Sequence, residues 1–229
     1  MRYDITNIPV SEVFEEGDGC PICRLRNKLE QRAVEYITGA AMMEPDIRIE
    51  TNRKGFCLTH YRQMLRQRTR LSVALMMETR LDELEKQVFS GLPLLGKSAT
   101  KQAKDAGQRT DSCFVCDQMN EALEKMLATV CRTYEQQRDF RELFERQDCL
   151  CLPHFSALVE ASQAVMSKKN QPDFAKEAAR LAHKYLTELR EDVRHFCKMY
   201  DHSNAGNNDW GNSKDSIERA IWFLTTREP

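Results

Sequence analysis

The sequence lacks the features by which a chain enters or spans a membrane. The first sixteen residues, MRYDITNIPVSEVFEE, carry acidic side chains where a secretory signal needs an unbroken apolar stretch. No later segment approaches the roughly 18 consecutive apolar residues that a membrane-spanning helix needs. These absences predict a cytoplasmic protein.

An excess of charge of one sign is also missing, because 34 lysines and arginines nearly balance 35 aspartates and glutamates. No global field therefore marks a binder of nucleic acid or of membrane surfaces, and any such patch must be local. Strand-forming patterns are scarce as well, since apolar and polar residues alternate only briefly, in DIRIET (46–51). With 229 residues, 41% of them hydrophobic, the chain can bury a core in one domain or in two small ones.

Motifs of common enzyme classes are absent too. The sequence contains no nucleophile elbow, no phosphate-binding loop, no paired catalytic carboxylates and no metal motif that leaves a coordination position open. We therefore expect no catalytic residues and a protein that is not an enzyme.

Helical periodicity dominates what is present. Apolar residues recur at helical spacing after Cys23, in RLRNKLEQRAVEYI, and after Cys116, in DQMNEALEKMLATVCRTY. Longer helices rich in good helix formers are predicted at 70–89 and 174–200. The pattern predicts an all-α fold.

Two parts of the chain resemble each other. CPIC (20–23), a helix and FCLTHY (56–61) match CFVC (113–116), a helix and LCLPHF (150–155), with an offset of 93 residues at the first cysteines and 94 at the Cys-x-x-His pairs. Between them, two glycines, a proline and a polar run indicate a linker. The predicted organisation is a first repeat at 1–90, a linker at 91–110, a second repeat at 111–200, and a C-terminal loop with a docking helix at 201–229.

Each repeat contains three cysteines and one histidine that suit a metal ion. Two sulfurs bound at about 2.3 Å to one tetrahedral ion lie roughly 3.7 Å apart, which a turn with two intervening residues allows. Four protein ligands leave no open position, which is typical of a structural site. The predicted sets, one per repeat, are Cys20, Cys23, Cys57 and His60, and Cys113, Cys116, Cys151 and His154.

The duplicated spacing favours metal binding over buried thiols and histidines that bind nothing. Nine cysteines, an odd number in a cytoplasmic chain, are not expected to form a disulfide framework. We predict two zinc ions per chain, with an iron–sulfur cluster or a redox dithiol as alternatives. Cys131, Cys149 and Cys197 have no counterpart in the other repeat and are interpreted as core or boundary residues, although Cys149 could compete for the metal.

Six motifs, in this order, resemble a known bacterial family: MRYDITNIPV, CPIC, MEPDIRIETNRKGFCLTH, CFVCD, CLPHF and WGNSKD. The family is domain of unknown function 6062, found mainly in anaerobic Gram-positive bacteria, and the resemblance covers nearly the whole chain. It implies no activity, because none is established for the family.

Two surfaces are candidates for binding. The polar segment Glu44 to Arg53, with Arg48 and Asn52, is either a binding surface of the first repeat or a loop that caps neighbouring helices. The stretch 48–70 is basic, with Arg62, Arg66 and Arg68 among its cations, and either meets phosphate or forms a solvated helix face.

The tail contains a polar loop and a short helix. Trp210, in the loop that reaches Asp215, is either a plug in a groove or an exposed anchor for a partner. Asn212 or Ser213 is placed to cap the helix, which is expected to dock on the body. Its predicted apolar face comprises Ile217, Ala220, Ile221 and Leu224.

Three function classes remain open. The chain is first interpreted as a zinc-binding helical scaffold or interaction protein with structural metal sites. The alternatives are a binder of nucleic acid or phosphate through 48–70, and a thiol-based redox or metal sensor. We expect a protein partner or self-association, with nucleic acid ranked below these, and no membrane.

Overall fold

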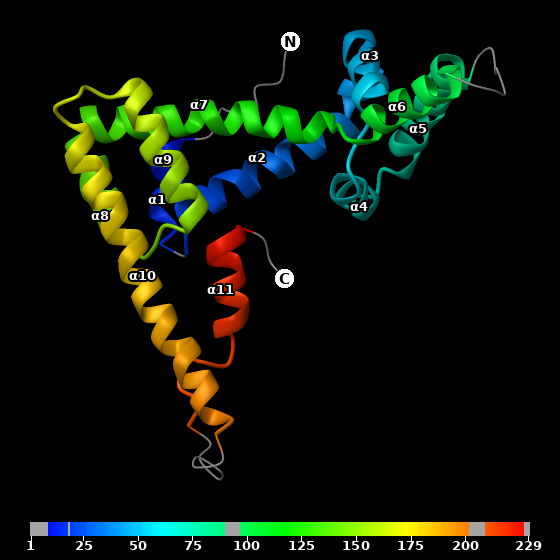
Figure 1. Ribbon diagram of the computed structural model, residues 1–229. Coiled ribbons are helices and arrows are strands. Elements are labelled where there is room, and N and C mark those ends of the chain that lie inside the picture. The colour runs from blue at the N-terminus through cyan, green and yellow to red at the C-terminus, as the bar shows by residue number, and fades with distance from the viewer. Residues whose placement is uncertain (1–8, 18, 90–96, 202–208, 227–229) are drawn as a thin grey trace. The chain divides into compact units, whose positions relative to one another are not determined.

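The computed structural model describes residues 9–17, 19–89, 97–201 and 209–226 (Figure 1). These ranges form helices, turns and loops without a β-strand, so the predicted all-α fold is confirmed for them. In the same ranges, no helix combines the length and apolar character needed to cross a membrane.

The chain divides into two compact units that are not simple halves of the sequence. Within the described ranges, unit 1 consists of residues 28–122, and unit 2 consists of residues 9–27 and 123–226. The division falls inside α2 (Pro21–Thr38) and inside α7 (Phe114–Gln136), so each of these helices begins in one unit and ends in the other. This division differs from the predicted boundaries, because unit 2 contains parts of both predicted repeats.

Unit 1 is built around α5, which lies against α3 and α4. Val73 and Met76 of α5 and Met64 of α4 are buried, since they follow the helical period that places them on inward faces. The elements of this unit, besides parts of α2 and α7, are η1 (Ala40–Met43), α3 (Pro45–Lys54), α4 (Leu58–Arg66), α5 (Arg70–Leu84), a π-helical turn η2 (Glu85–Phe89) and α6 (Lys97–Thr110).

Two segments of unit 1 differ from the sequence-based expectation. Residues 97–110 of the predicted linker form α6, which lies against α3 and η2. Alanine, lysine and glutamine in this segment are good helix formers, and they outweigh the single internal Gly107. The expected break at 91–96 lies outside the described residues. The DIRIET segment, where alternation was noted, is part of α3 and is helical.

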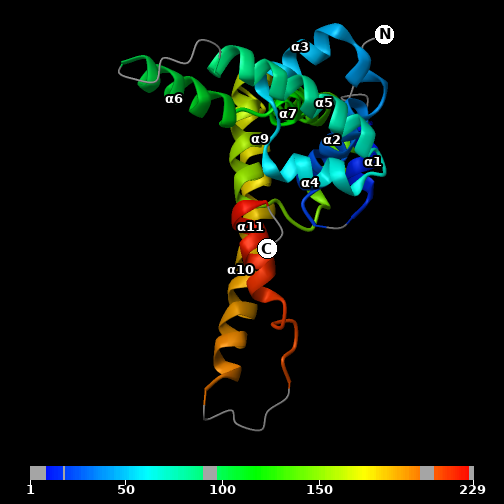
Figure 2. The same cartoon turned by 90° about the vertical axis from the view of Figure 1, so that its right-hand side faces the viewer.

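Unit 2 has an aromatic core. Phe144 contacts Phe14, Tyr134 and Phe174 with ring centroids 5.8, 5.2 and 5.3 Å apart, so four segments meet at this ring. α10 runs beside α9 and α11 (Figures 1 and 2). α1 lies against α8. The elements, besides parts of α2 and α7, are α1 (Val10–Glu15), α8 (Arg138–Glu145), α9 (Leu152–Val165), α10 (Gln171–Met199) and α11 (Ser216–Thr225).

The last helix, α11, lies against α9 and α10, but with a different face from the predicted one. Ser216 and Phe223 are buried against the body. Ile217, Ile221 and Leu224 are instead 44%, 38% and 55% exposed, so the prediction that they form the docking face is wrong. Each buried residue directly precedes a residue of the predicted face in the sequence. The helix is therefore rotated about its axis by about 100° relative to the predicted orientation.

The loop before α11 contacts the end of α10. Trp210 is partly buried, and its ring lies 5.7 Å from that of Phe196 and 5.6 Å from that of Tyr200, between centroids. The N-cap residue of α11 is Asp215, and neither Asn212 nor Ser213 occupies that position.

Candidate metal centres

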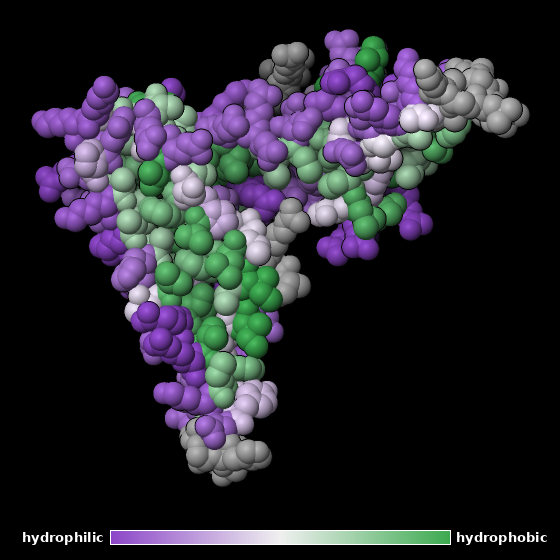
Figure 3. Space-filling view, viewed as in Figure 1, coloured by the Kyte–Doolittle hydropathy of each residue, from purple (hydrophilic) through white to green (hydrophobic). Residues whose placement is uncertain are grey.

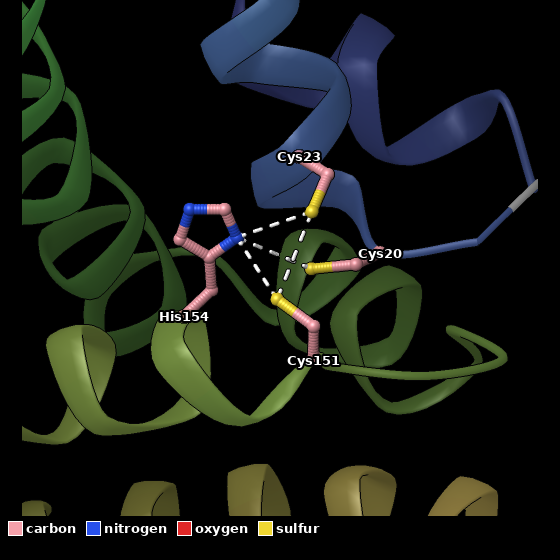
Figure 4. A group of neighbouring side chains, drawn as sticks. All are labelled: Cys20, Cys23, Cys151 and His154. Atoms are coloured by element: carbon pink, nitrogen blue, oxygen red, sulfur yellow. Dashed lines mark hydrogen bonds between the residues drawn. The ribbon is translucent and has the colours of Figure 1, made fainter. Parts of the chain in front are cut away.

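The eight predicted ligands lie in two clusters of four, and each cluster is contained in one unit. Within each cluster, the sulfur and imidazole nitrogen atoms that could bind an ion all lie within 4.8 Å of one another. The Cys20 site, in unit 2, consists of Cys20, Cys23, Cys151 and His154 (Figure 4). The Cys57 site, in unit 1, consists of Cys57, His60, Cys113 and Cys116.

Each of the eight predicted residues lies in one of the two clusters, but the predicted grouping of the pairs was wrong. The Cys-x-x-Cys pair of each repeat-like segment meets the Cys-x-x-His pair of the other. The physical reason is the helix that follows each Cys-x-x-Cys pair. α2 has 18 residues and α7 has 23, so at 1.5 Å per residue they carry the chain about 27 and 35 Å away before the next ligand pair. Whether the two segments are true repeats remains a prediction.

Each Cys-x-x-His pair gains its geometry from the start of a helix. Cys57 and Cys151 are the extended N-cap residues of α4 and α9, and His60 and His154 occupy the third position of those helices. An N-cap side chain and the side chain at the third helical position lie on the same side of the first turn. Sulfur and imidazole therefore face one point, with the Sγ to Nδ1 distance 3.1 Å in both pairs.

Each Cys-x-x-Cys pair also stands at a helix start. The amide of Arg24 donates to the carbonyl of Cys20 at 3.2 Å, and the amide of Asp117 donates to the carbonyl of Cys113 at 3.1 Å, which closes the first turns of α2 and α7. Both thiols of a pair are thus held on the same turn.

The distances in the Cys20 site are those of a tetrahedral coordination shell. The sulfur atoms of Cys23 and Cys151 are 3.7 Å apart, and Nδ1 of His154 is 3.3 Å from the sulfur of Cys23 and 3.8 Å from that of Cys20. Zinc–sulfur bonds of about 2.3 Å and zinc–nitrogen bonds of about 2.0 Å require separations of roughly 3.7 and 3.5 Å. The site fits such an ion with shifts of a few tenths of an ångström.

The Cys57 site has the same geometry and an additional carboxylate. The sulfurs of Cys57 and Cys116 are 3.9 Å apart, and Nδ1 of His60 is 3.2 Å from the sulfur of Cys113. On the other side of the imidazole ring, Nε2 of His60 lies 3.0 Å from a carboxylate oxygen of Glu30. With Nδ1 as the metal-binding atom, Nε2 carries the proton and donates to Glu30, an arrangement that orients histidine ligands.

The hydrogen bonds within each cluster favour one thiolate. Burial opposes ionisation of Cys20, but hydrogen bonds with Cys151, Cys23 and His154 hold its pKa well below the ordinary value. In the other cluster, burial again opposes ionisation, but hydrogen bonds from His60 and the backbone lower the pKa of Cys113 to about 6. Burial and the nearby Cys113 thiolate raise the pKa of Cys116 to about 12. Thiols bind a metal ion as thiolates, so metal binding at either site would release protons.

The two sites differ in exposure to solvent. All four residues of the Cys20 site are buried, with Cys151 fully inaccessible. In the Cys57 site, His60 and Cys113 are buried while Cys57 and Cys116 are partly exposed. Reagents in solution can therefore reach the Cys57 site more readily.

A buried arginine connects the two ligand segments of the Cys57 site, and the sequence-based prediction missed it. The guanidinium of Arg80 donates to the carbonyls of Arg53 and Arg109, each at 2.8 Å, and also to that of Asn52. These carbonyls belong to the last turns of α3 and α6, just before the two ligand pairs. Arg80 falls on the buried stripe of α5, where a charged residue is unusual.

Direct contacts add to this connection. The amide of Phe114 donates to the carbonyl of Gly55 at 2.9 Å, and the hydroxyl of Ser112 donates to the carbonyl of Lys54 at 2.7 Å. Gly55 has φ of +66° and lies so close to Arg80 that an added Cβ would be 3.2 Å from Nη2. Glycine is required there both by the backbone conformation and by the close approach.

The Cys20 site has a comparable connection. Arg24 donates to the carbonyls of Val13 and Gly19 and to the side-chain oxygen of Gln147, at 2.9 to 3.2 Å. Gln147, which is 6% exposed, donates to the carbonyl of Phe14 at 2.7 Å. The segment before Cys20 is thereby held against the segment before Cys151.

The remaining cysteines lie outside both clusters. Cys131 and Cys149 are fully buried, and Cys197 is exposed. Burial raises the pKa of Cys131 to about 12 and also raises that of Cys149. Cys149 lies near the Cys20 site but is not one of its four residues.

The two candidate binding surfaces, at 44–53 and 48–70, lie in unit 1. Glu44 is the N-cap residue of α3, and Asn52 accepts a hydrogen bond from Thr79 at 2.9 Å. Arg53 pairs with Glu50 at 2.7 Å in an exposed position. Arg62 and Arg66 are exposed on α4, and Arg68 is exposed in the turn that follows. The segment at 45–54 is therefore a helix whose polar side chains have partners in α3 itself and in α5. The basic side chains of α4 face solvent.

The comparisons with known proteins give one match. A family model described as "Family of unknown function (DUF6062)" matches residues 1–229, the whole chain. The searches of curated proteins and of solved structures find no match.

Proposed function

The chain belongs to this family of unknown function, and from the chemistry of its two clusters we propose that it is a zinc-binding helical scaffold. The observation that carries the proposal is that each cluster unites two chain segments far apart in sequence. Cys23 and Cys151 are 128 residues apart, and Cys57 and Cys116 are 59 apart. One ion per cluster would therefore cross-link segments of the same unit that are far apart in the sequence.

Zinc is favoured by the kind and number of the ligands. Three thiolates and one imidazole form a soft to borderline set, and tetrahedral sulfur–nitrogen sites are typical of zinc. The measured separations suit one ion in each cluster. An iron–sulfur cluster is a weaker candidate, because a cluster distributes its ligands over two or more irons, whereas all ligand atoms of each site lie within 4.8 Å of one another, as around a single ion.

A structural role is favoured over a catalytic one. Four protein ligands saturate a tetrahedral ion and leave no position for a substrate or a reactive water. Burial of all four residues of the Cys20 site also limits access of any substrate to that ion. The ions would then contribute folding free energy, as structural zinc does in small domains.

Elemental analysis tests the proposal. Untagged protein produced without added metal should contain about two zinc ions per chain, because each four-ligand set saturates one ion. A strong chelator should remove the zinc and lower the melting temperature. One zinc ion or none would contradict the two-site proposal, and iron with visible absorption would identify a cluster.

Binding of nucleic acid or phosphate through residues 48–70 is the second candidate. It is supported by the exposure of Arg62, Arg66 and Arg68. A cavity of about 510 Å³ nearby is less suited to phosphate, because Asp105 and Asp117 line it together with its cations. Contacts with phosphate release counterions, so a true complex would weaken steeply between 50 and 200 mM salt and on reversing the three charges. We expect no salt-sensitive binding tighter than micromolar.

A redox or metal sensor is the third candidate. A sensor needs an accessible thiolate and a resolving thiol close to it. Cys149 is two positions from Cys151 and would be the resolving residue of such a sensor, but its complete burial argues against that role. Mild peroxide should therefore release zinc slowly and equally from the wild type and from Cys149→Ala. Fast, stoichiometric release that disappears in the variant would favour the sensor.

A further inference from the structure

The surface of unit 2 carries an apolar strip on α11 that the fold does not cover. Ile217, Ile221 and Leu224 are spaced by four and three residues, so they form one ridge along the helix. They are 44%, 38% and 55% exposed. The space-filling view shows a hydrophobic area over α11 and the neighbouring helices (Figure 3).

An apolar groove lies directly beside this ridge. It has a volume of about 220 Å³ and runs between α10 and α11. Leu186 of α10, at its wall, is 44% exposed, and Leu224 belongs to both the ridge and the groove. The apolar side chains that line it are Leu186, Leu189, Val193, Ala220, Phe223 and Leu224. Contiguous exposed apolar surface of this kind usually marks an interaction site.

Charged residues border the apolar surface with opposite signs on its two sides. Arg190 and Arg194 line the groove on α10, and both contact Glu191, so the three groups together retain one positive charge. On α11, the exposed Glu218 follows Ile217 of the ridge. A partner that fits this face needs a ridge for the groove, a groove for the ridge and charges in the reverse order.

We propose that a second copy of this chain is that partner, with the face of α10 and α11 in one protomer bound to the same face in the other. A two-fold interface requires a surface that complements itself, and a ridge next to a groove meets this condition. A two-fold axis that runs along α11 also brings Glu218 of one protomer toward the side of the other that carries Arg190 and Arg194. This dimer rests on the proposed scaffold function, since it gives the scaffold its first partner.

Sedimentation equilibrium of the full zinc-loaded chain tests the proposal. The wild type should dimerise in the micromolar range, and Ile221→Glu should raise the dissociation constant at least tenfold by placing a charge in the apolar centre. The matched control is Leu71→Glu, at a 72% exposed leucine of α5 in unit 1, which should leave the constant unchanged. Both substitutions are at exposed sites, so the fold should persist, as circular dichroism can verify.

A charge exchange identifies the face more sharply. Arg190→Glu and Glu218→Arg should each weaken the dimer several-fold, and the double variant should recover most of the loss, because the opposite charges then face each other again. A monomer at all concentrations, an unaffected Ile221→Glu variant, or the absence of recovery in the double variant would each overturn the proposal. Zinc content measured on the same samples keeps this result separate from the metal proposal, which stands if a monomer holds two ions.

Discussion

Pairs of substitutions can decide which ligands share an ion. Cys23→Ser with Cys151→Ser removes two ligands from the Cys20 site only, whereas Cys23→Ser with Cys57→Ser removes one from each site. The first pair should leave about one zinc ion per chain, and the second pair close to none at a moderate chelator concentration. The matched control, Cys131→Ser, alters a buried cysteine outside both clusters and should keep about two ions.

The expected loss of stability follows from the chain length that each ion closes. A cross-link lowers the entropy of the unfolded chain and so raises the free energy of unfolding. The gain is about 5 kcal/mol for a cross-link across 128 residues, as between Cys23 and Cys151, and about 4 kcal/mol for one across 59 residues. Loss of the Cys20 site should therefore lower the melting temperature of unit 2 by roughly 10 to 20 °C.

Zinc content after gel filtration and thermal melts followed by circular dichroism provide the measurements. The two substitutions within the Cys20 site should be strongly non-additive, because the first already disables the site. The two substitutions in different sites should be nearly additive. The opposite outcome, with one ion retained by the Cys23 and Cys57 pair and none by the Cys23 and Cys151 pair, would refute the exchanged grouping.

Three further predictions concern the groups around the sites. Glu30→Gln should weaken zinc binding at the Cys57 site by about tenfold to a hundredfold through loss of the His60 contact, while exposed Glu35→Gln should not, as chelator competition can measure. Arg80→Met should cost about 3 kcal/mol, because three backbone carbonyls lose a charged donor; denaturant titration against exposed Arg70→Met tests this, and equal stability of the two would contradict it. Lowering the pH from 7 to 4 should release both ions, since protons compete for the thiolates and affinity falls as pH falls; helix loss that precedes zinc release, in dye and circular dichroism traces, would contradict it.

Local sequence patterns predicted most of the helices and the residues that form the two clusters. The stripe of α2, with Ile22, Leu25 and Leu29, follows the helical period and is buried as the period requires. The spacing within each Cys-x-x-Cys and Cys-x-x-His pair indicated all eight residues of the two clusters, because the geometry inside a pair is local. The linker prediction failed at 97–110, because the good helix formers of this segment form α6.

Which pairs share a cluster depends on how the helices are arranged in the folded chain. Either Cys-x-x-Cys pair satisfies the local spacing equally well with either Cys-x-x-His pair, so no property of a single pair can distinguish the groupings. The rigid lengths of α2 and α7 decide it, since each carries the chain away from its own cysteines and toward the other unit. Glu30 and Arg80 were likewise beyond prediction, because a carboxylate on a histidine and a guanidinium on distant carbonyls become contacts only when separate helices meet.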